Sequence, residues 1–128
     1  MEKKYALRLL DIYIENAVRI FDGGFGCDRA ENAMFAAVDL LREYESLGPD
    51  FLSRVRDTLS KADVWRTDSG TMPLELIELA IHDLRWPEFQ QLIETRRSMF
   101  PLDTKHISLK AAFDPNWCGR EYFQRYRN

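Results

Sequence analysis

The chain has 128 residues, of which 45% are hydrophobic and 30% charged, a composition typical of one folded domain and not of a disordered chain. Two cysteines, Cys27 and Cys118, are too few for a disulfide scaffold; two reduced thiols are favoured, and a single bridge stays open. The net charge is −3, and the acidic balance argues against general nucleic-acid binding, because phosphate contacts supply most of that affinity.

The first residues carry no secretion signal. Met1 to Lys4 lead into an amphipathic stretch and not into an apolar run with a cleavage site. No apolar run approaches the roughly 20 residues that span a bilayer. We therefore expect a cytoplasmic protein with no membrane partner.

The first two expected helices cover residues 3–21 and about 28–45. Apolar residues recur there at spacings of three and four, the pattern of a helix with one buried face. The stretch FDGGFGCDR (21–29) separates them, and Asp28 with Glu31 forms a capping pattern for the second helix. Because this glycine loop follows a helix, it lacks the strand-to-helix setting of a phosphate loop, and Gly24 and Gly26 occupy positions where a calcium loop needs oxygen ligands. We interpret it as a turn.

Three further helices are expected over residues 50–62, 73–84 and 87–96. Pro49 and Pro87 interrupt the helical pattern, and residues 67–71 form a polar loop. Residues 104–113 alternate between apolar and polar and fit either a short strand or a helix. Asp114 and Pro115 then introduce a last helix over 116–126. The sequence predicts one all-α domain, residues 1–128, with five to six helices and an extended segment near 105–113 as the open alternative.

Cys27 is a weak candidate for a nucleophile. Its place before a helix N-terminus favours a lowered thiol pKa, but a nucleophile also needs a base within reach. The chain has two histidines, His82 and His106, and no spacing joins either of them to Cys27 in a known catalytic pattern.

Glu75, Glu78, His82 and Arg85 share one stripe of the fourth helix, opposite its apolar face. Carboxylates and an imidazole on one face can bind a metal, but helical-bundle metal sites draw matching ligands from other helices, and no second E-x-x-H occurs. We interpret the stripe as a solvated face with local ion pairs.

Residues 73–97, PLELIELAIHDLRWPEFQQLIETRR, resemble a HEAT-like helical hairpin with its corner at Arg85-Trp86-Pro87. The size, charge and helical make-up are also similar to small cytosolic immunity proteins, which neutralise bacterial toxins. The resemblance implies a binding protein whose acidic surface blocks a partner's active site.

We therefore expect a non-enzymatic protein-binding module, an inhibitor or immunity protein with a basic protein partner and no cofactor or metal. The expected contact residues are Trp65 as an apolar anchor, the carboxylates Asp68, Glu75 and Glu78, and His82. The alternatives are a small metal- or thiol-dependent enzyme that uses Cys27 or the Glu78/His82 face, and a homo-oligomeric structural protein.

Overall fold

The computed structural model describes residues 1–62 and 71–127, and in these ranges the chain is all-α with no strand, as predicted. The elements in chain order are α1 (Lys3–Asp22), α2 (Cys27–Glu43), η1 (Glu45–Leu47), α3 (Gly48–Leu59), α4 (Leu74–Leu84), α5 (Glu88–Met99), α6 (Lys105–Ala111), η2 (Cys118–Tyr122) and η3 (Gln124–Tyr126), where η denotes a 3-10 helix.

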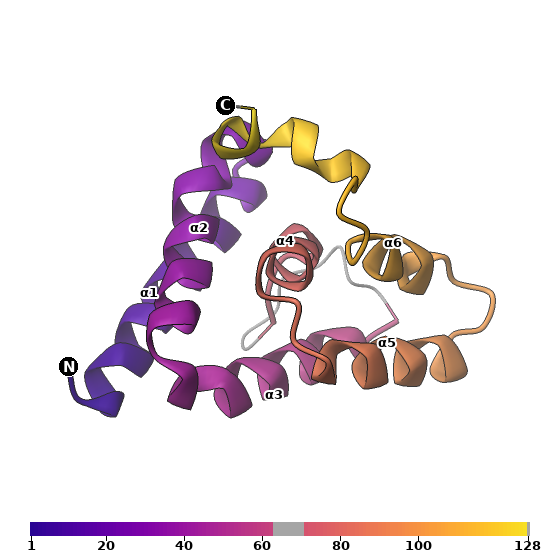
Figure 1. Cartoon of the computed structure of the whole chain (residues 1–128), viewed down its shortest axis with the longest axis horizontal. Coiled ribbons are helices and arrows are strands. Elements are labelled where there is room, and N and C mark those ends of the chain that lie inside the picture. The colour runs from indigo at the N-terminus through magenta and orange to yellow at the C-terminus, as the bar shows by residue number, and fades with distance from the viewer. Residues whose placement is uncertain (63–70, 128) are drawn as a thin grey trace.

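Helices α1 and α2 pack side by side along one edge of a triangular molecule (Figure 1). The buried face of α1 repeats every three or four residues, as the sequence pattern predicts: Ala6, Leu10, Ile14 and Ala17. The turn between the two helices contains Gly24 at φ +90°, a conformation that glycine adopts without steric strain. The interpretation of this loop as a turn is confirmed.

Helix α4 lies at the centre, where α2 and α6 pack against it (Figure 1). It has buried apolar residues around most of its circumference: Leu74, Leu76, Ile77, Leu79, Ala80 and Ile81. A helix that is apolar on nearly all sides is a core helix, and each fully buried Leu or Ile contributes about 1.5–3 kcal/mol. The remaining face, which carries Glu75, Glu78 and His82, therefore lies among neighbours and not in open solvent.

The corner between α4 and α5 is formed by Arg85, which has a left-handed φ of 58°, and by Trp86. The Trp86 ring stacks on Phe89 at 5.7 Å between centroids and meets Phe51 of α3 edge-on. In Figure 1 α4 is seen nearly end-on while α5 lies across the view, and α5 packs on α3 and α6. The two helices thus cross steeply at this corner.

Residues 105–111 form helix α6, so the extended alternative for this region was wrong. A strand needs a neighbouring strand to pair its backbone groups, and none is present in the described part of the chain. As a helix the segment buries Leu109 and leaves Ile107 exposed.

The expected last α-helix is also absent, because residues 118–126 form the two short 3-10 helices η2 and η3. The backbone N–H groups of Gln124 and Arg125 donate to the Glu31 carboxylate of α2 at 2.7 and 3.1 Å instead of continuing a helical ladder. Glu31 was expected to cap its own helix, but α2 begins after Gly26 with no side-chain cap. Its carboxylate fixes the C-terminal segment instead.

Arg96 on α5 joins three parts of the fold although it is only 1% exposed. Its guanidinium donates to the carbonyl oxygen of Leu59 at 2.9 Å and to that of Lys61, just beyond the end of α3. It also pairs with Asp103 at 2.9 Å and lies 4.1 Å from the centre of the Phe100 ring. Arg96 therefore supplies donors for carbonyl groups that the end of α3 leaves unpaired.

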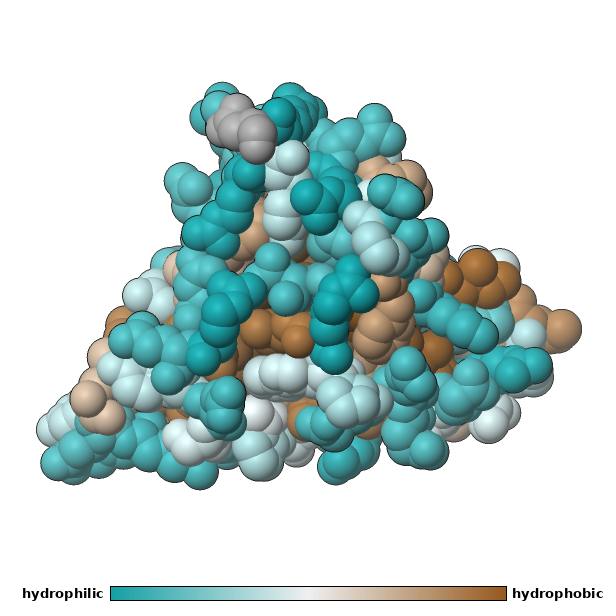
Figure 2. All heavy atoms as spheres, in the orientation of Figure 1, coloured by the Kyte–Doolittle hydropathy of each residue, from teal (hydrophilic) through white to brown (hydrophobic). Residues whose placement is uncertain are grey.

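Hydrophilic side chains cover most of the face seen in Figure 2, and apolar atoms gather at its right-hand corner. The exposed apolar residues Met99, Leu102 and Ile107 belong to the end of α5, the following loop and α6. Of the helices described, none has the length and apolar character needed to cross a membrane.

Candidate functional site

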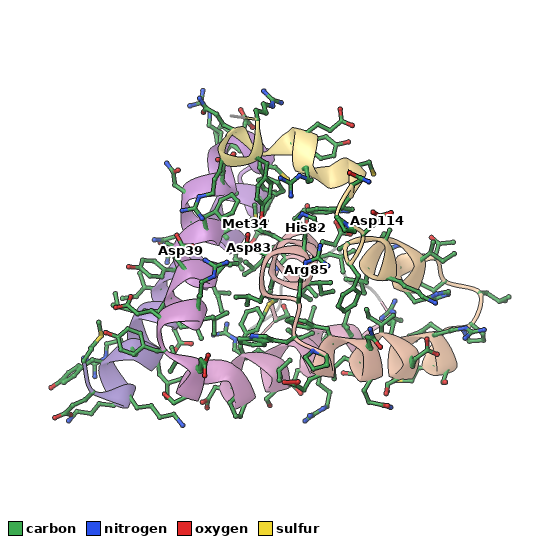
Figure 3. All side chains as sticks on the ribbon, viewed as in Figure 1. Met34, Asp39, His82, Asp83, Arg85 and Asp114 are labelled. Atoms are coloured by element: carbon green, nitrogen blue, oxygen red, sulfur yellow. The ribbon has the colours of Figure 1, made fainter. Side chains whose placement is uncertain are left out.

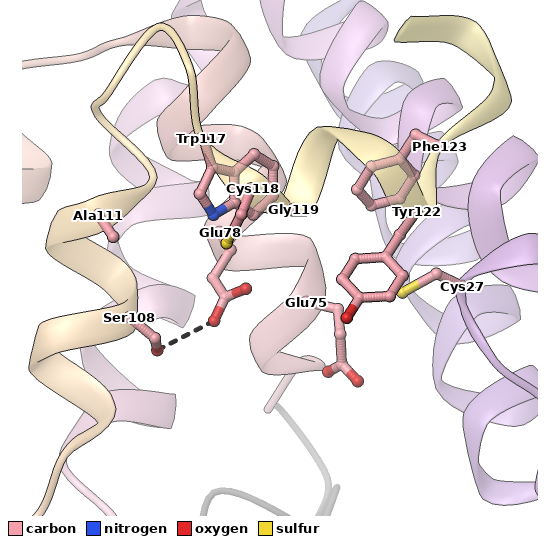
Figure 4. A pocket seen from close by; sticks show the side chains of 10 residues that line it. All are labelled: Cys27, Glu75, Glu78, Ser108, Ala111, Trp117, Cys118, Gly119, Tyr122 and Phe123. Atoms are coloured by element: carbon pink, nitrogen blue, oxygen red, sulfur yellow. Dashed lines mark hydrogen bonds between the residues drawn. The ribbon is translucent and has the colours of Figure 1, made fainter. Parts of the chain in front are cut away.

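A pocket of about 340 Å³ opens where the C-terminal segment, residues 112–127, crosses α4 and α2 (Figure 4). Four elements and the link after α6 line it: Cys27 from α2, Glu75 and Glu78 from α4, Ser108 and Ala111 from α6, Trp117 before η2, and Cys118, Gly119, Tyr122 and Phe123 from η2 and the residue after it. The pocket thus brings together residues that lie far apart in the sequence.

Glu75 and Glu78 supply two carboxylates from the same face of α4 (Figure 4). The Ser108 hydroxyl donates to Oε1 of Glu78 at 3.1 Å, whereas Glu75 makes no hydrogen bond or ion pair with a described residue. Burial, together with the nearby negative charge of Glu75, raises the pKa of Glu78 to about 7. Among the described residues that line the pocket, none carries a positive charge to balance these carboxylates.

The two cysteines lie on the same pocket, and both are free thiols. Cys27 is the first residue of α2, but burial and the negative charges of Glu75 and Glu78 raise its pKa to about 11. The sequence favoured a lowered pKa at this helix N-terminus, and that expectation was wrong because burial and the two carboxylates outweigh the helix dipole.

Aromatic rings form the apolar side of the pocket. Trp117 and Phe123 are buried, with ring centroids 6.3 Å apart, whereas Tyr122 is 66% exposed. The Trp117 ring lies directly on Gly119, where an added Cβ would stand only 2.2 Å from a ring carbon. Glycine is required at position 119 because it gives Trp117 room.

His82 does not lie on a solvent-facing stripe, because it is only 4% exposed and faces the C-terminal segment (Figure 3). Its Nδ1–H donates to the carbonyl oxygen of Ala112 at 2.8 Å, and its Nε2 accepts from Arg120 at 2.7 Å. Burial is the main cause that lowers the pKa of His82. The Arg120 guanidinium lies over the Tyr126 ring, whose hydroxyl donates to Asp83 at 2.7 Å.

The expectation that His82 contacts a partner was therefore wrong, and so was the interpretation of the stripe as a solvated face. The stripe on α4 was identified correctly, but the sequence pattern does not show that α6 and the C-terminal segment cover it. Glu78 and His82, proposed as a shared metal face, use different neighbours: Glu78 faces the pocket, while both ring nitrogens of His82 are occupied.

An ion pair also holds the C-terminal segment on α2. Arg125 donates to both carboxylate oxygens of Asp39 at 3.0 and 2.7 Å, and its guanidinium lies 4.1 Å from the centre of the Phe35 ring. The hydrogen bond from Arg125 is the main cause that lowers the pKa of Asp39. These contacts were not predicted, although the net charge of +3 on residues 105–128 and −6 on residues 1–104 pointed to such pairing.

The expected site residues thus separate into three groups. Glu75 and Glu78 meet in the pocket, His82 lies behind it, and Trp65 and Asp68 fall outside the described residues. Within residues 1–62 and 71–127, no three His, Cys, Asp or Glu side chains are grouped as metal ligands would be. Neither a protein-family model, nor a curated protein, nor a solved structure matches this chain.

Proposed function

We propose that this chain is a protein-binding module of the inhibitor or immunity type, and that its basic partner docks over the pocket between α4 and the C-terminal segment. One observation carries the proposal: Glu75 and Glu78 both line an aromatic pocket whose described lining holds no cation. A pocket that combines an apolar wall, polar side chains and a perturbed pKa is a place where binding is expected.

The energetics of the two carboxylates support a cationic partner. A half-buried carboxylate without a counter-charge is costly, and the raised pKa of Glu78 expresses that cost. A positive group that enters the pocket supplies the missing counter-charge. The pocket is therefore more complementary to a basic surface than to a neutral or acidic one.

The mechanism is occlusion, in which the module covers a basic cleft of its partner and prevents that cleft from binding its own substrate. Complementary charge accelerates association in a salt-dependent way. Trp65 and Asp68 remain predicted contacts of the same interface.

The enzyme alternative receives less support from the same pocket. A thiol with a pKa of about 11 is protonated at neutral pH, and the ring nitrogens of His82 are both engaged in the fold. Cys27 therefore lacks the two features that activate a cysteine nucleophile, a low pKa and a free base.

The test is capture of partners from the native host with three tagged proteins: wild type, the double variant Glu75→Gln/Glu78→Gln, and the control Glu88→Gln/Glu94→Gln. The control removes the same charge from exposed positions on α5. We expect wild type and control to retain one stoichiometric basic protein at low salt, and the pocket variant to retain at least tenfold less. Equal retention by all three proteins, or retention of only further copies of this chain, contradicts the proposal.

A further inference from the structure

We propose that the group entering the pocket is the primary alkylammonium of a lysine side chain. This inference rests on the proposed function for the source of the lysine, a basic partner protein, but the chemistry follows from the pocket itself. An apolar wall and two carboxylates stand within one space, and a lysine has the matching parts, a hydrocarbon stem and a charged end.

The apolar wall fits the stem. Trp117 and Phe123 present carbon surface, and Ala111 from α6 and Tyr122 from η2 extend it toward solvent. A lysine stem that lies along such a wall buries methylene groups, each worth about 0.8 kcal/mol when fully buried. An aromatic face next to an ammonium also adds a cation–π attraction of about 0.5–1 kcal/mol or more.

The shape of the charged end favours an ammonium over a guanidinium. An ammonium is a compact charge with three donors that rotate toward separate acceptors, and a guanidinium is a rigid plane with five donors. The carboxylate of Glu78 is turned toward Ser108, which donates to it, and that of Glu75 stands apart from it on the same helix (Figure 4). Two separate carboxylates suit rotating donors, whereas a planar fork is matched by acceptors that lie together in one plane.

Binding of a lysine is coupled to ionisation of Glu78. The other titratable groups that line the pocket are Glu75 on α4, Cys27 on α2, and Cys118 and Tyr122 on η2. Since the pKa of Glu78 lies near 7, only about a tenth of the free protein has this carboxylate charged at pH 6, and about nine tenths at pH 8. A cation that requires charged Glu78 therefore binds up to about tenfold more tightly at pH 8 and releases a proton from Glu78 at lower pH.

The test uses n-butylamine hydrochloride, which has the stem and end group of lysine, in an NMR titration of the full chain. We expect saturable shifts of the Ser108 and Gly119 amide signals at pH 8, with binding up to about tenfold weaker at pH 6. The variant Glu78→Gln should lose at least tenfold in affinity and its pH dependence, while the control Glu94→Gln behaves as wild type. A lysine-containing peptide should shift the same signals as the amine.

Two further probes test whether the pocket requires the primary ammonium group. 1-Butanol keeps the stem but has no charge, and n-propylguanidine hydrochloride carries the end group of arginine. Equal binding of 1-butanol, tighter binding of n-propylguanidine, or no shift with n-butylamine overturns the lysine proposal.

The proposed function can fail separately from this inference. If n-butylamine binds in a Glu78-dependent way but the peptide does not, or if no protein depends on Glu75 and Glu78 for capture, the pocket takes a free amine and the protein-binding role is overturned. If capture of a basic partner requires both carboxylates while n-butylamine and the peptide fail to bind, the proposed function stands and the inference of a bound lysine is overturned.

Discussion

Arg96 and Glu78 are two charged side chains that the fold removes from water, and their surroundings differ. Arg96 donates to backbone carbonyl groups at the end of α3 and pairs with Asp103, so its charge and most of its donors have partners within the chain. Glu78 accepts one hydrogen bond from the neutral Ser108, and the charge of Glu75, which raises the pKa of Glu78, has the same sign.

The comparison separates a structural charge from a charge available for binding. Removing a buried charge whose partners lie within the chain leaves those partners unpaired and destabilises the fold. Removing a charge that has no counter-charge relieves a cost, so that the fold becomes more stable while any ligand loses its partner. Arg96 and Glu78 should therefore respond to neutralisation with opposite signs.

Neutralising Arg96 is expected to have the largest effect. The variant Arg96→Met keeps most of the side-chain volume but removes every donor from the carbonyl groups of Leu59 and Lys61 and the counter-charge from Asp103. We expect the free energy of unfolding to fall by about 4 kcal/mol. Urea denaturation followed by circular dichroism measures it.

The neighbouring Arg97 is the control, since it is exposed and, within residues 1–62 and 71–127, its ion pair is with Glu94 of the same helix. Arg97→Met should change the free energy of unfolding by less than about 0.5 kcal/mol. A similar small loss in both variants would mean that the contacts of Arg96 do not stabilise the packing of α5 on α3. Arg96 would then not be a structural charge, and its contrast with Glu78 would be wrong.

The second prediction concerns the wall that gives the pocket its shape. In Gly119→Ala the new Cβ would stand 2.2 Å from the Trp117 ring, so the ring must move and the wall of the pocket with it. We expect a loss of about 2 to 3 kcal/mol from overpacking, together with loss of n-butylamine binding. Thermal unfolding and the NMR titration measure the two effects.

Gly48 is the control for Gly119, because it also lies next to a tryptophan ring, that of Trp86. A Cβ added there lies 3.6 Å from the Trp86 ring, an ordinary contact, and the residue is in helix α3. Gly48→Ala should leave stability unchanged or raise it by up to about 1 kcal/mol, because alanine favours a helix. If Gly119→Ala is as harmless, the Trp117 ring is not fixed by close packing on Gly119.

Sequence periodicity was sufficient for most of the fold because apolar residues recur at helical spacing in α1 to α5, although α4 is buried on nearly all sides. Residues 105–111 were ambiguous, since seven residues fit a period of two as well as a helix, and only contacts with α4 and α5 decide between them. The last segment was predicted as an α-helix because local patterns do not reveal that the Glu31 carboxylate binds its backbone.

The site was harder to predict for a related reason. The shared stripe of Glu75, Glu78 and His82 follows from helical spacing, but whether a stripe faces solvent depends on what packs over it. Trp117 and Gly119 come from more than 35 residues away in the chain, so no local pattern places them beside Glu78. The burial of Arg96 could not be predicted for the same reason, because its neighbours in the sequence give no sign that it is buried.

The third and smallest effect is the opposite response of Glu78. In the unfolded chain this carboxyl loses its proton near 4.5, whereas in the folded protein it keeps the proton up to about 7. At Glu78 the folded state therefore binds more protons between these values, and the contribution of this group to the stability of the wild type falls as the pH rises from 4.5 to 7. The full shift corresponds to about 3 kcal/mol, and partial solvent exposure of Glu78 reduces it. Glu78→Gln removes this penalty, so it should stabilise the fold by about 2 kcal/mol at pH 8 and by almost nothing at pH 4.

Urea denaturation of wild type and variant at pH 4, 6 and 8 measures this difference, with the exposed Glu94→Gln as the control that should show none. Burial lowers the pKa of His82, and this residue is common to all three proteins, so its contribution cancels in the comparison. A stabilisation that grows with pH means that the chain carries an uncompensated charge at neutral pH, the condition under which a cation entering the pocket gains most. A loss of stability at pH 8 would instead place Glu78 with Arg96, as a charge that holds the fold together.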